Sequence, residues 1–147
     1  MFQVFSQFSK DLFFGIYFES MFGEFIPKIE TLLKIENKYF SIILTDDKFI
    51  KKINKSYRNK NYATDVISFP SSDVPLESID SEDEIGEIYI SVETAVRQAE
   101  NFVVSIEDEM KRLVVHGILH LMGFDHERSR EDEIIMNEQE DFILERI

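Results

Sequence analysis

The three histidines of this chain fall within one short window, and their types and spacing predict a metal site. His116 and His120 are four residues apart, so in a helix they would lie one turn apart on the same face. Gly123 could end that helix in a left-handed turn and return the chain so that His126 reaches the same point. Three neutral imidazoles with one open position form the ligand set of a catalytic zinc site. The spacing therefore predicts one Zn²⁺ per chain, with another divalent transition metal as the alternative, because imidazole also suits Cu, Fe and Ni.

The spacing of these ligands matches that of the H-E-x-x-H-x-x-G-x-x-H signature of metzincin proteases, with one difference. In those proteases the residue after the first histidine is a glutamate that acts as general base. Here that residue is Gly117, which has no side chain. The sequence therefore predicts the same metal ligands as in these proteases but not their general base, so this chain needs a different reaction or a different base.

Length and composition predict one soluble globular domain over residues 1–147, because 44% of the residues are hydrophobic and 31% are charged. The chain has no cysteine, which excludes disulfides and thiolate metal sites. Near the N-terminus, the longest uncharged stretch before Glu19 is Leu12 to Phe18, which is too short to span a bilayer and follows no basic segment. We therefore expect a cytoplasmic protein that does not enter the membrane.

The charge of the chain is unevenly distributed. A net charge of −13 argues against broad, non-specific binding to nucleic acid, and no DNA partner is expected. Residues 73–87 contain only acidic charges, whereas residues 48–60 contain only basic ones, namely Lys48, Lys51, Lys52, Lys55, Arg58 and Lys60. The four lysines at positions 48, 51, 52 and 55 would share one helix face, so they form a candidate patch for binding RNA phosphates.

Periodicity of the apolar residues predicts four strands, at about 2–8, 39–44, 65–69 and 85–91. It predicts helices at about 11–36, with Pro27 as a break or kink, and at 46–57, 91–101 and 131–146, together with the helix that carries His116 and His120. Thr45 or Asp46, Ser91 and Ser105 are candidate N-caps. Residues 71–84 read as a mobile acidic connection. We expect an α+β domain with a mixed four-stranded sheet and about five helices, with the metal site on a helix of the C-terminal half and the turn after it.

Three stretches of the chain resemble the YbeY family of bacterial metal-dependent endoribonucleases. The first is His116-Gly117-xx-His120-Leu121-x-Gly123-x-Asp125-His126, which is specific because it combines the histidines with glycine at 117. The second runs from Asn54 through Tyr57-Arg58-x-Lys60 to Thr64-Asp65-Val66-Ile67-Ser68-Phe69-Pro70, and the third is Gly86-Glu87-Ile88-Tyr89-Ile90-Ser91. The chain departs from the family at Asn59, Asn61 and Ala63, where glycine, aspartate and proline are more common. These departures lie beside Arg58 and concern the turn predicted at Asn59 to Asn61 rather than the histidines.

The resemblance implies a zinc-dependent endoribonuclease specific for single-stranded RNA. It implies action in ribosomal RNA maturation, at the 3′ end of the small-subunit rRNA, and in ribosome quality control. Ribosomal RNA and the ribosome or its small subunit would then be the partners. It also implies His116, His120 and His126 as the metal ligands and Arg58 as a catalytic residue of the cleft.

The sequence leaves several roles open. Arg58 has the planar fork that grips a phosphate in two places, but without the resemblance a surface ion pair would be the favoured interpretation. Asp125 could accept the second N–H of a ligand histidine, or it could stabilise the turn before His126. Thr64 and Ser68 could contact substrate or simply end a strand, and Glu127 could be a base or a solvated acid. No general base is identified.

Two other functions compete with RNA hydrolysis. A metallopeptidase is supported by the spacing of the ligands and opposed by Gly117 and by the basic residues at 48–60. A non-catalytic ribosome-assembly factor would hold a structural metal, which needs four protein ligands. With no cysteine and no fourth histidine in the chain, Asp125 or Glu127 would have to supply the fourth ligand.

Overall fold

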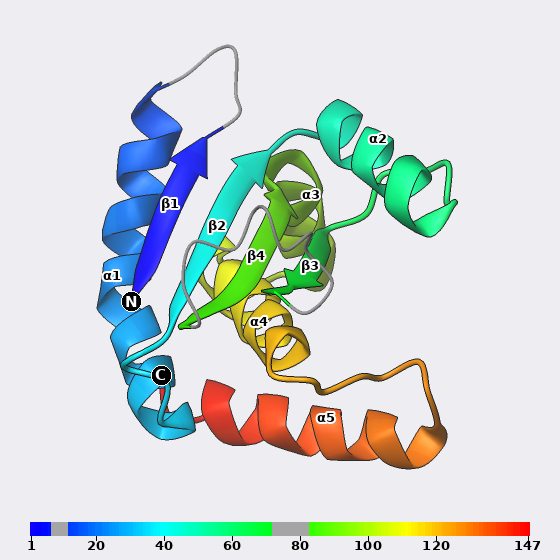
Figure 1. Ribbon diagram of the computed structural model, residues 1–147. Helices are drawn as coiled ribbons and strands as arrows, with labels where there is room; N and C mark the ends of the chain where they lie inside the picture. The colour runs from blue at the N-terminus through cyan, green and yellow to red at the C-terminus, as the bar shows by residue number, and fades with distance from the viewer. Residues whose placement is uncertain (7–11, 72–82) are drawn as a thin grey trace.

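The computed structural model of the chain describes residues 1–6, 12–71 and 83–147. Within these ranges the elements follow in the order β1 (Phe2–Ser6), α1 (Leu12–Leu33), β2 (Tyr39–Thr45), α2 (Asp47–Arg58), β3 (Val66–Pro70), β4 (Glu84–Ser91), α3 (Val92–Phe102), α4 (Ile106–Leu121) and α5 (Arg130–Leu144). The strands form one sheet in the order β1-β2-β4-β3, in which only β3 runs antiparallel to its neighbour (Figure 1). The predicted α+β fold, with a mixed four-stranded sheet and five helices, is confirmed.

Helix α4 passes behind the sheet and contacts α1, α3 and α5 as well as strands β3 and β4 (Figure 1). Its apolar side chains, among them Leu113, Val114 and Ile118, are completely buried against a core that includes Ile88 and Ile90 of β4. Burying an aliphatic side chain of this size contributes about 1.5–3 kcal/mol. Packing therefore holds the helix that carries His116 and His120 in place on several sides.

Gly117 is the residue at which α4 comes closest to the sheet. A methyl group built on its Cα would lie 2.8 Å from Cγ2 and 3.0 Å from Cδ1 of Ile88 on β4. The Ser68 hydroxyl also donates a hydrogen bond of 3.3 Å to the Gly117 carbonyl, which ties α4 to β3. Position 117 therefore faces the sheet, and its lack of a side chain is a packing requirement of this fold.

Replacing Gly117 with alanine should destabilise the chain by about 1–3 kcal/mol, because the added methyl overpacks the contact with Ile88. Urea unfolding of the variant and of the wild-type chain measures the difference. Gly23→Ala in α1 is a matched control, because nothing lies within 4 Å of a Cβ built there. Equal losses in both variants would show that the approach of α4 to β4 is not the cause.

Helix α2 lies over a second, smaller apolar cluster. Side chains alternate along a strand, so Tyr89 faces the side of β4 opposite to Ile88 and Ile90. Tyr89 and Phe69 pack there against a cluster that contains Ile50 and Ile53 of α2. The N-cap of α2 is Asp46, whose Oδ1 accepts a 2.8 Å hydrogen bond from the Phe49 amide. This packing fixes the C-terminal end of α2, where Arg58 lies.

Most of the predicted boundaries hold where the structure describes them. Ser91 and Ser105 cap α3 and α4, as predicted. Of the break or kink expected at Pro27, the break is wrong, because α1 continues through this residue. Residues 7–8 of the first predicted strand and nearly all of the predicted acidic connection at 71–84 lie outside the described residues; Glu84 begins β4. None of the described helices is long and apolar enough to cross a bilayer.

Candidate metal centre

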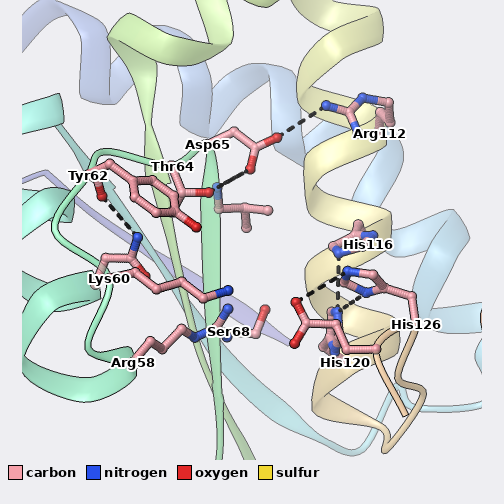
Figure 2. Close-up of a pocket in the computed structure, with 13 residues that line it drawn as sticks. Arg58, Lys60, Tyr62, Thr64, Asp65, Ser68, Arg112, His116, His120 and His126 are labelled. Carbon is pink, nitrogen blue, oxygen red and sulfur yellow. Dashed lines mark hydrogen bonds and ion pairs between the residues drawn. The ribbon is translucent and has the colours of Figure 1, made fainter. Parts of the chain in front are cut away.

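The three histidines meet at one point, as their spacing predicts. His116 and His120 project from the C-terminal half of α4, and His126 approaches them from the loop after the helix (Figure 2). His120 Nε2 lies 3.1 Å from His116 Nε2 and 3.2 Å from His126 Nδ1. One ring nitrogen from each histidine lies within 4.8 Å of the others. All three rings are partly exposed, so the point where they meet is open to solvent on one side.

These separations fit a tetrahedral metal ion. Zinc–imidazole bonds of about 2.0–2.1 Å at tetrahedral angles place neighbouring nitrogens about 3.3 Å apart. The distances of 3.1 and 3.2 Å around His120 agree with that spacing. In the part of the chain that the structure describes, no fourth histidine, aspartate or glutamate joins this group. The three rings could therefore hold one ion and leave one coordination position open.

The turn that brings His126 back is a Schellman motif at the end of α4. The amide of Phe124 donates to the Leu119 carbonyl at 3.0 Å, and the amide of Gly123 donates to the His120 carbonyl at 3.0 Å. Gly123 has a φ of 97°, which a residue with a side chain adopts only with strain. The left-handed turn predicted at Gly123 is confirmed, and it places His126 beside the helix that it follows.

A residue that the sequence analysis did not select orients the first histidine. Glu140 of α5 lies with Oε1 2.5 Å from His116 Nδ1, and both side chains are largely buried. A carboxylate here accepts the Nδ1–H proton, which leaves the Nε2 lone pair of His116 pointing toward the other two rings. Helix α5 is held in place by the buried residues Met136 and Ile143. Because α5 is rich in acidic residues, nothing in the sequence singles out Glu140 before the helices are packed.

Asp125 takes the second of the two roles considered for it. Its Oδ1 accepts a 2.8 Å hydrogen bond from the backbone amide of Glu127, and this bond lowers the pKa of the Asp125 carboxyl. Arg128 lies 3.7 Å from its Oδ2. Asp125 therefore stabilises the turn around His126, and the carboxylate that contacts a histidine ring is Glu140 instead.

Two adjoining cavities meet at the histidines. The first, of about 320 Å³, extends from the histidines toward Tyr62, Asp65 and Arg112, and Thr64 and Ser68 also line it. The second, of about 520 Å³, extends toward Phe124 and Arg128. Both cavities are lined by Arg58, Lys60, Ser68, His120, His126 and Glu127. The histidines therefore lie in the middle of a continuous groove.

Arg58 and Lys60 enter this groove from the end of α2. Asn59 between them adopts a left-handed conformation with a φ of 57°, which asparagine tolerates better than most residues. This confirms the turn expected near Asn59. Among the residues that the structure describes, neither Arg58 nor Lys60 forms an ion pair, so the surface ion pair considered for Arg58 is absent there.

The other basic and acidic candidates lie as follows. The lysine face of α2 is exposed but lies outside both cavities; it consists of Lys48, Lys51, Lys52 and Lys55. Lys60, which the sequence analysis did not select, lines both cavities. Glu127 lines both as well, with its Oε1 3.8 Å from His126 Nε2.

The environment of His120 favours its neutral form, which is the form that binds metal. Burial, followed by the electrostatic effects of His116 and His126, lowers the pKa of His120 to about 4. Arg58 acts in the same direction, whereas Asp125 opposes it. A ligand that is already neutral at pH 7 does not have to release a proton when a metal binds.

The stability of the metal-free chain should therefore fall as the pH is lowered from about 6.5 toward 4. In this range the unfolded chain protonates His120 near its ordinary pKa of about 6.5, whereas the folded chain does not. The unfolded state binds the extra proton, so acid reduces the free energy of unfolding. Urea unfolding in a chelating buffer at several pH values, compared with His120→Gln, isolates this contribution. An equally steep decline in the variant would contradict it.

The chain is similar to proteins of a known family. Residues 14–147 match the family model described as Endoribonuclease YbeY. The chain is 42% identical over 115 residues to the Endoribonuclease YbeY of Aquifex aeolicus, covering 78% of this chain and 74% of that protein. It is 42% identical over 124 residues to the protein of the same name from Persephonella marina, covering 84% and 80%. A solution structure of a protein from Thermotoga maritima matches with a TM-score of 0.64 at 26% identity, covering 99% of this chain and 87% of that one.

Proposed function

The chain belongs to the endoribonuclease YbeY family, and from this premise we propose that it is a zinc-dependent endoribonuclease that cleaves single-stranded RNA. Internal cleavage of RNA is the activity in the name of its relatives. The observation that best supports the proposal is that the three histidines line the same groove as Arg58, which has no ion-pair partner among the described residues. We further propose that the substrate is ribosomal RNA, including the 3′ end of the small-subunit rRNA, that the chain takes part in ribosome quality control, and that it acts on or beside the ribosome in the cytoplasm.

The residues of the groove divide the work of phosphodiester hydrolysis. His116, His120 and His126 would hold a divalent ion, which when bound would supply a water ligand with its pKa lowered to near seven. Arg58 grips two non-bridging oxygens of the phosphate with its planar fork and neutralises the charge that grows on them in the transition state. Lys60 adds a second positive charge in the same groove. The lysine face of α2, being exposed and outside the cavities, would bind neighbouring phosphates of the strand.

The geometry disfavours both competing functions. A glutamate at position 117 would not reach the metal as it does in a metzincin, because this position faces Ile88 on β4. A structural metal needs four protein ligands, and only three converge within the described part of the chain. An open coordination position is instead what hydrolysis requires.

The substrate class can be tested directly with the purified, metal-loaded chain. It should cleave an unstructured RNA, leave the same sequence largely intact as a duplex, and leave casein uncut. Casein degradation without RNA cleavage would favour the peptidase. No cleavage of either substrate, with one metal ion bound, would favour the non-catalytic factor.

Removing the carboxylate that orients His116 should weaken metal binding. Glu140→Ala should raise the dissociation constant for zinc by about 10–100-fold, the usual effect of losing such a hydrogen-bond partner. Glu138→Ala is the matched control, because Glu138 is an exposed acid on the same helix and contacts no histidine. Competition with a chromophoric chelator measures both affinities. If the two variants bind zinc equally well, Glu140 does not orient His116 for the metal.

A further inference from the structure

Tyr62 is an aromatic residue of the metal-side cavity that none of the motifs above uses. It lines the first cavity together with the histidines, and 55% of its surface is exposed. Figure 2 shows it on the α2 side of the cavity, across from the three histidines. The side-chain amide of Asn54, which is buried, donates a 2.9 Å hydrogen bond to the Tyr62 carbonyl. The backbone that carries this exposed ring is therefore held in place.

The charges at the end of the cavity lined by Tyr62, Asp65 and Arg112 do not favour the binding of a phosphate. Arg112 Nη2 lies 2.6 Å from Glu109 Oε1 and 3.3 Å from Asp65 Oδ2, so two carboxylates face one guanidinium. The hydrogen bond with Glu109 raises the pKa of Arg112. One arginine facing two acidic residues leaves a formal excess of negative charge here. At the other end, Arg128 is likewise paired with Asp125 and Asp132. Of the cations that line the two cavities, Arg58 and Lys60 alone lack a carboxylate partner among the described residues, so the phosphates belong beside them.

The polar groups around Tyr62 are already engaged with one another. Asp65 Oδ1 accepts from the amide of Val66 at 2.8 Å, and Oδ2 accepts from Gln98 and from Arg112, both at 3.3 Å. The Thr64 hydroxyl donates to Asp65 as well. Among the described residues at this end of the cavity, the Asp65 carboxylate and the Arg112 guanidinium are therefore both engaged with partners. What remains available is the aromatic ring.

We propose that Tyr62 is a stacking subsite for one unpaired base of the RNA, next to the nucleotide whose phosphate lies at the histidines and Arg58. This inference rests on the proposed function and specifies how the same groove holds its substrate. An exposed ring beside unpaired cations is the combination with which proteins bind single-stranded nucleic acid. A cavity of about 320 Å³ also falls within the range of about 300–1,000 Å³ usual for pockets that hold small ligands.

Two properties of the substrate follow from this subsite. A base in a duplex is already stacked between its neighbours, so the subsite selects unpaired RNA. Stacking accepts every base because each has a π-face, and the saturated hydrogen bonds of Asp65 leave little to discriminate one base from another. Cleavage should therefore depend strongly on strandedness and weakly on the identity of the stacked base.

The test is a double-mutant cycle between the protein and the RNA. The metal-loaded chain first cleaves an unstructured RNA, which maps the position of the cut. Further copies of that RNA are then made, each lacking one base at a single position on one side of the cut or the other. Tyr62→Ala should lower kcat/KM on the intact RNA by about 10-fold, mainly through KM, and Tyr62→Phe should retain activity. Removing the stacked base should lower kcat/KM of the wild-type chain by a similar factor. The same removal should lower kcat/KM of Tyr62→Ala only slightly further.

Tyr57→Ala is the matched control, because Tyr57 is an exposed tyrosine of α2 that lines neither cavity. It should cleave both RNAs like the wild-type chain. Two results would overturn the subsite alone. One is that Tyr62→Ala cleaves the intact RNA at the wild-type rate. The other is that removing a base lowers kcat/KM of Tyr62→Ala by the same factor as it lowers kcat/KM of the wild-type chain, at every position tested. If the wild-type chain cleaves no RNA at all, the proposed function fails and the subsite fails with it.

Discussion

Replacing His120 with alanine should leave the chain without bound metal and without RNA cleavage. His120 is the central ring, since its Nε2 lies 3.1 Å from a nitrogen of His116 and 3.2 Å from a nitrogen of His126. The two remaining imidazoles make a poor site, so metal content should fall from about one equivalent to near zero. Elemental analysis of the purified variant, with its folding checked by circular dichroism, measures the loss.

The control for this prediction is Arg58→Ala, which removes a groove residue without removing a ligand. It should keep its full equivalent of metal. If His120→Ala also keeps one equivalent, the metal site lies elsewhere in the chain and the histidine cluster has another purpose.

Replacing Arg58 with alanine should lower single-turnover RNA cleavage by about 100-fold or more at saturating RNA, the scale of losing one charge-stabilising donor. Arg58 has no ion-pair partner among the described residues and is exposed at the end of α2, so the substitution should leave the fold intact. Arg58→Lys should restore little activity, because an ammonium cannot form the bidentate fork. Metal content is measured in parallel, so that a loss of cleavage can be assigned to the arginine.

The lysine face of α2 provides the comparison for Arg58. Truncating Lys51 and Lys52 should weaken RNA binding and flatten its dependence on salt, while the rate at saturating RNA stays near that of the wild-type chain. These lysines lie outside both cavities, whereas Arg58 lines both. Full activity in metal-loaded Arg58→Ala would remove this arginine from the mechanism.

The convergence of the three histidines could be predicted largely from the sequence because its geometry is local. An offset of four residues places two side chains on one helix face, and a glycine at the C-terminus of a helix permits the left-handed turn that returns the chain. Both rules act within a few residues of His120. The structure contains the turn at Gly123 and the three rings within hydrogen-bonding distance, as those rules require.

The contacts that depend on packing between distant elements could not be predicted in the same way. Glu140 reaches His116 only because α5 packs beside α4. The sequence around Glu140 does not distinguish it from the solvent-exposed acidic residues of the same helix. The local alternative was Asp125, which forms a turn with Glu127 instead. The same holds for Gly117, since the sequence shows that it lacks a side chain but does not predict its contact with Ile88.

The fold followed from periodicity, with errors where tertiary contacts outweigh local preference. Alternating and helical patterns gave the strands and helices correctly because each element buries one face. Pro27 was expected to break or kink α1, but the helix continues through it and buries Phe25, Ile26 and Ile29 around this position, so that packing outweighs the cost of the proline. Spacing selected the lysine face of α2, whose binding of RNA stays a prediction, but did not select Lys60, which lines both cavities from the turn after the helix.

The most direct test of the metal-dependent mechanism is single-turnover cleavage of an unstructured RNA by the chain stripped of metal and then reloaded with zinc. The stripped chain should not cleave, and cleavage should return in proportion to the zinc bound, with a plateau at about one equivalent. Reloaded His120→Ala should stay inactive throughout. Full cleavage by the stripped chain, or a fully reloaded wild-type chain that does not cleave, would contradict the account.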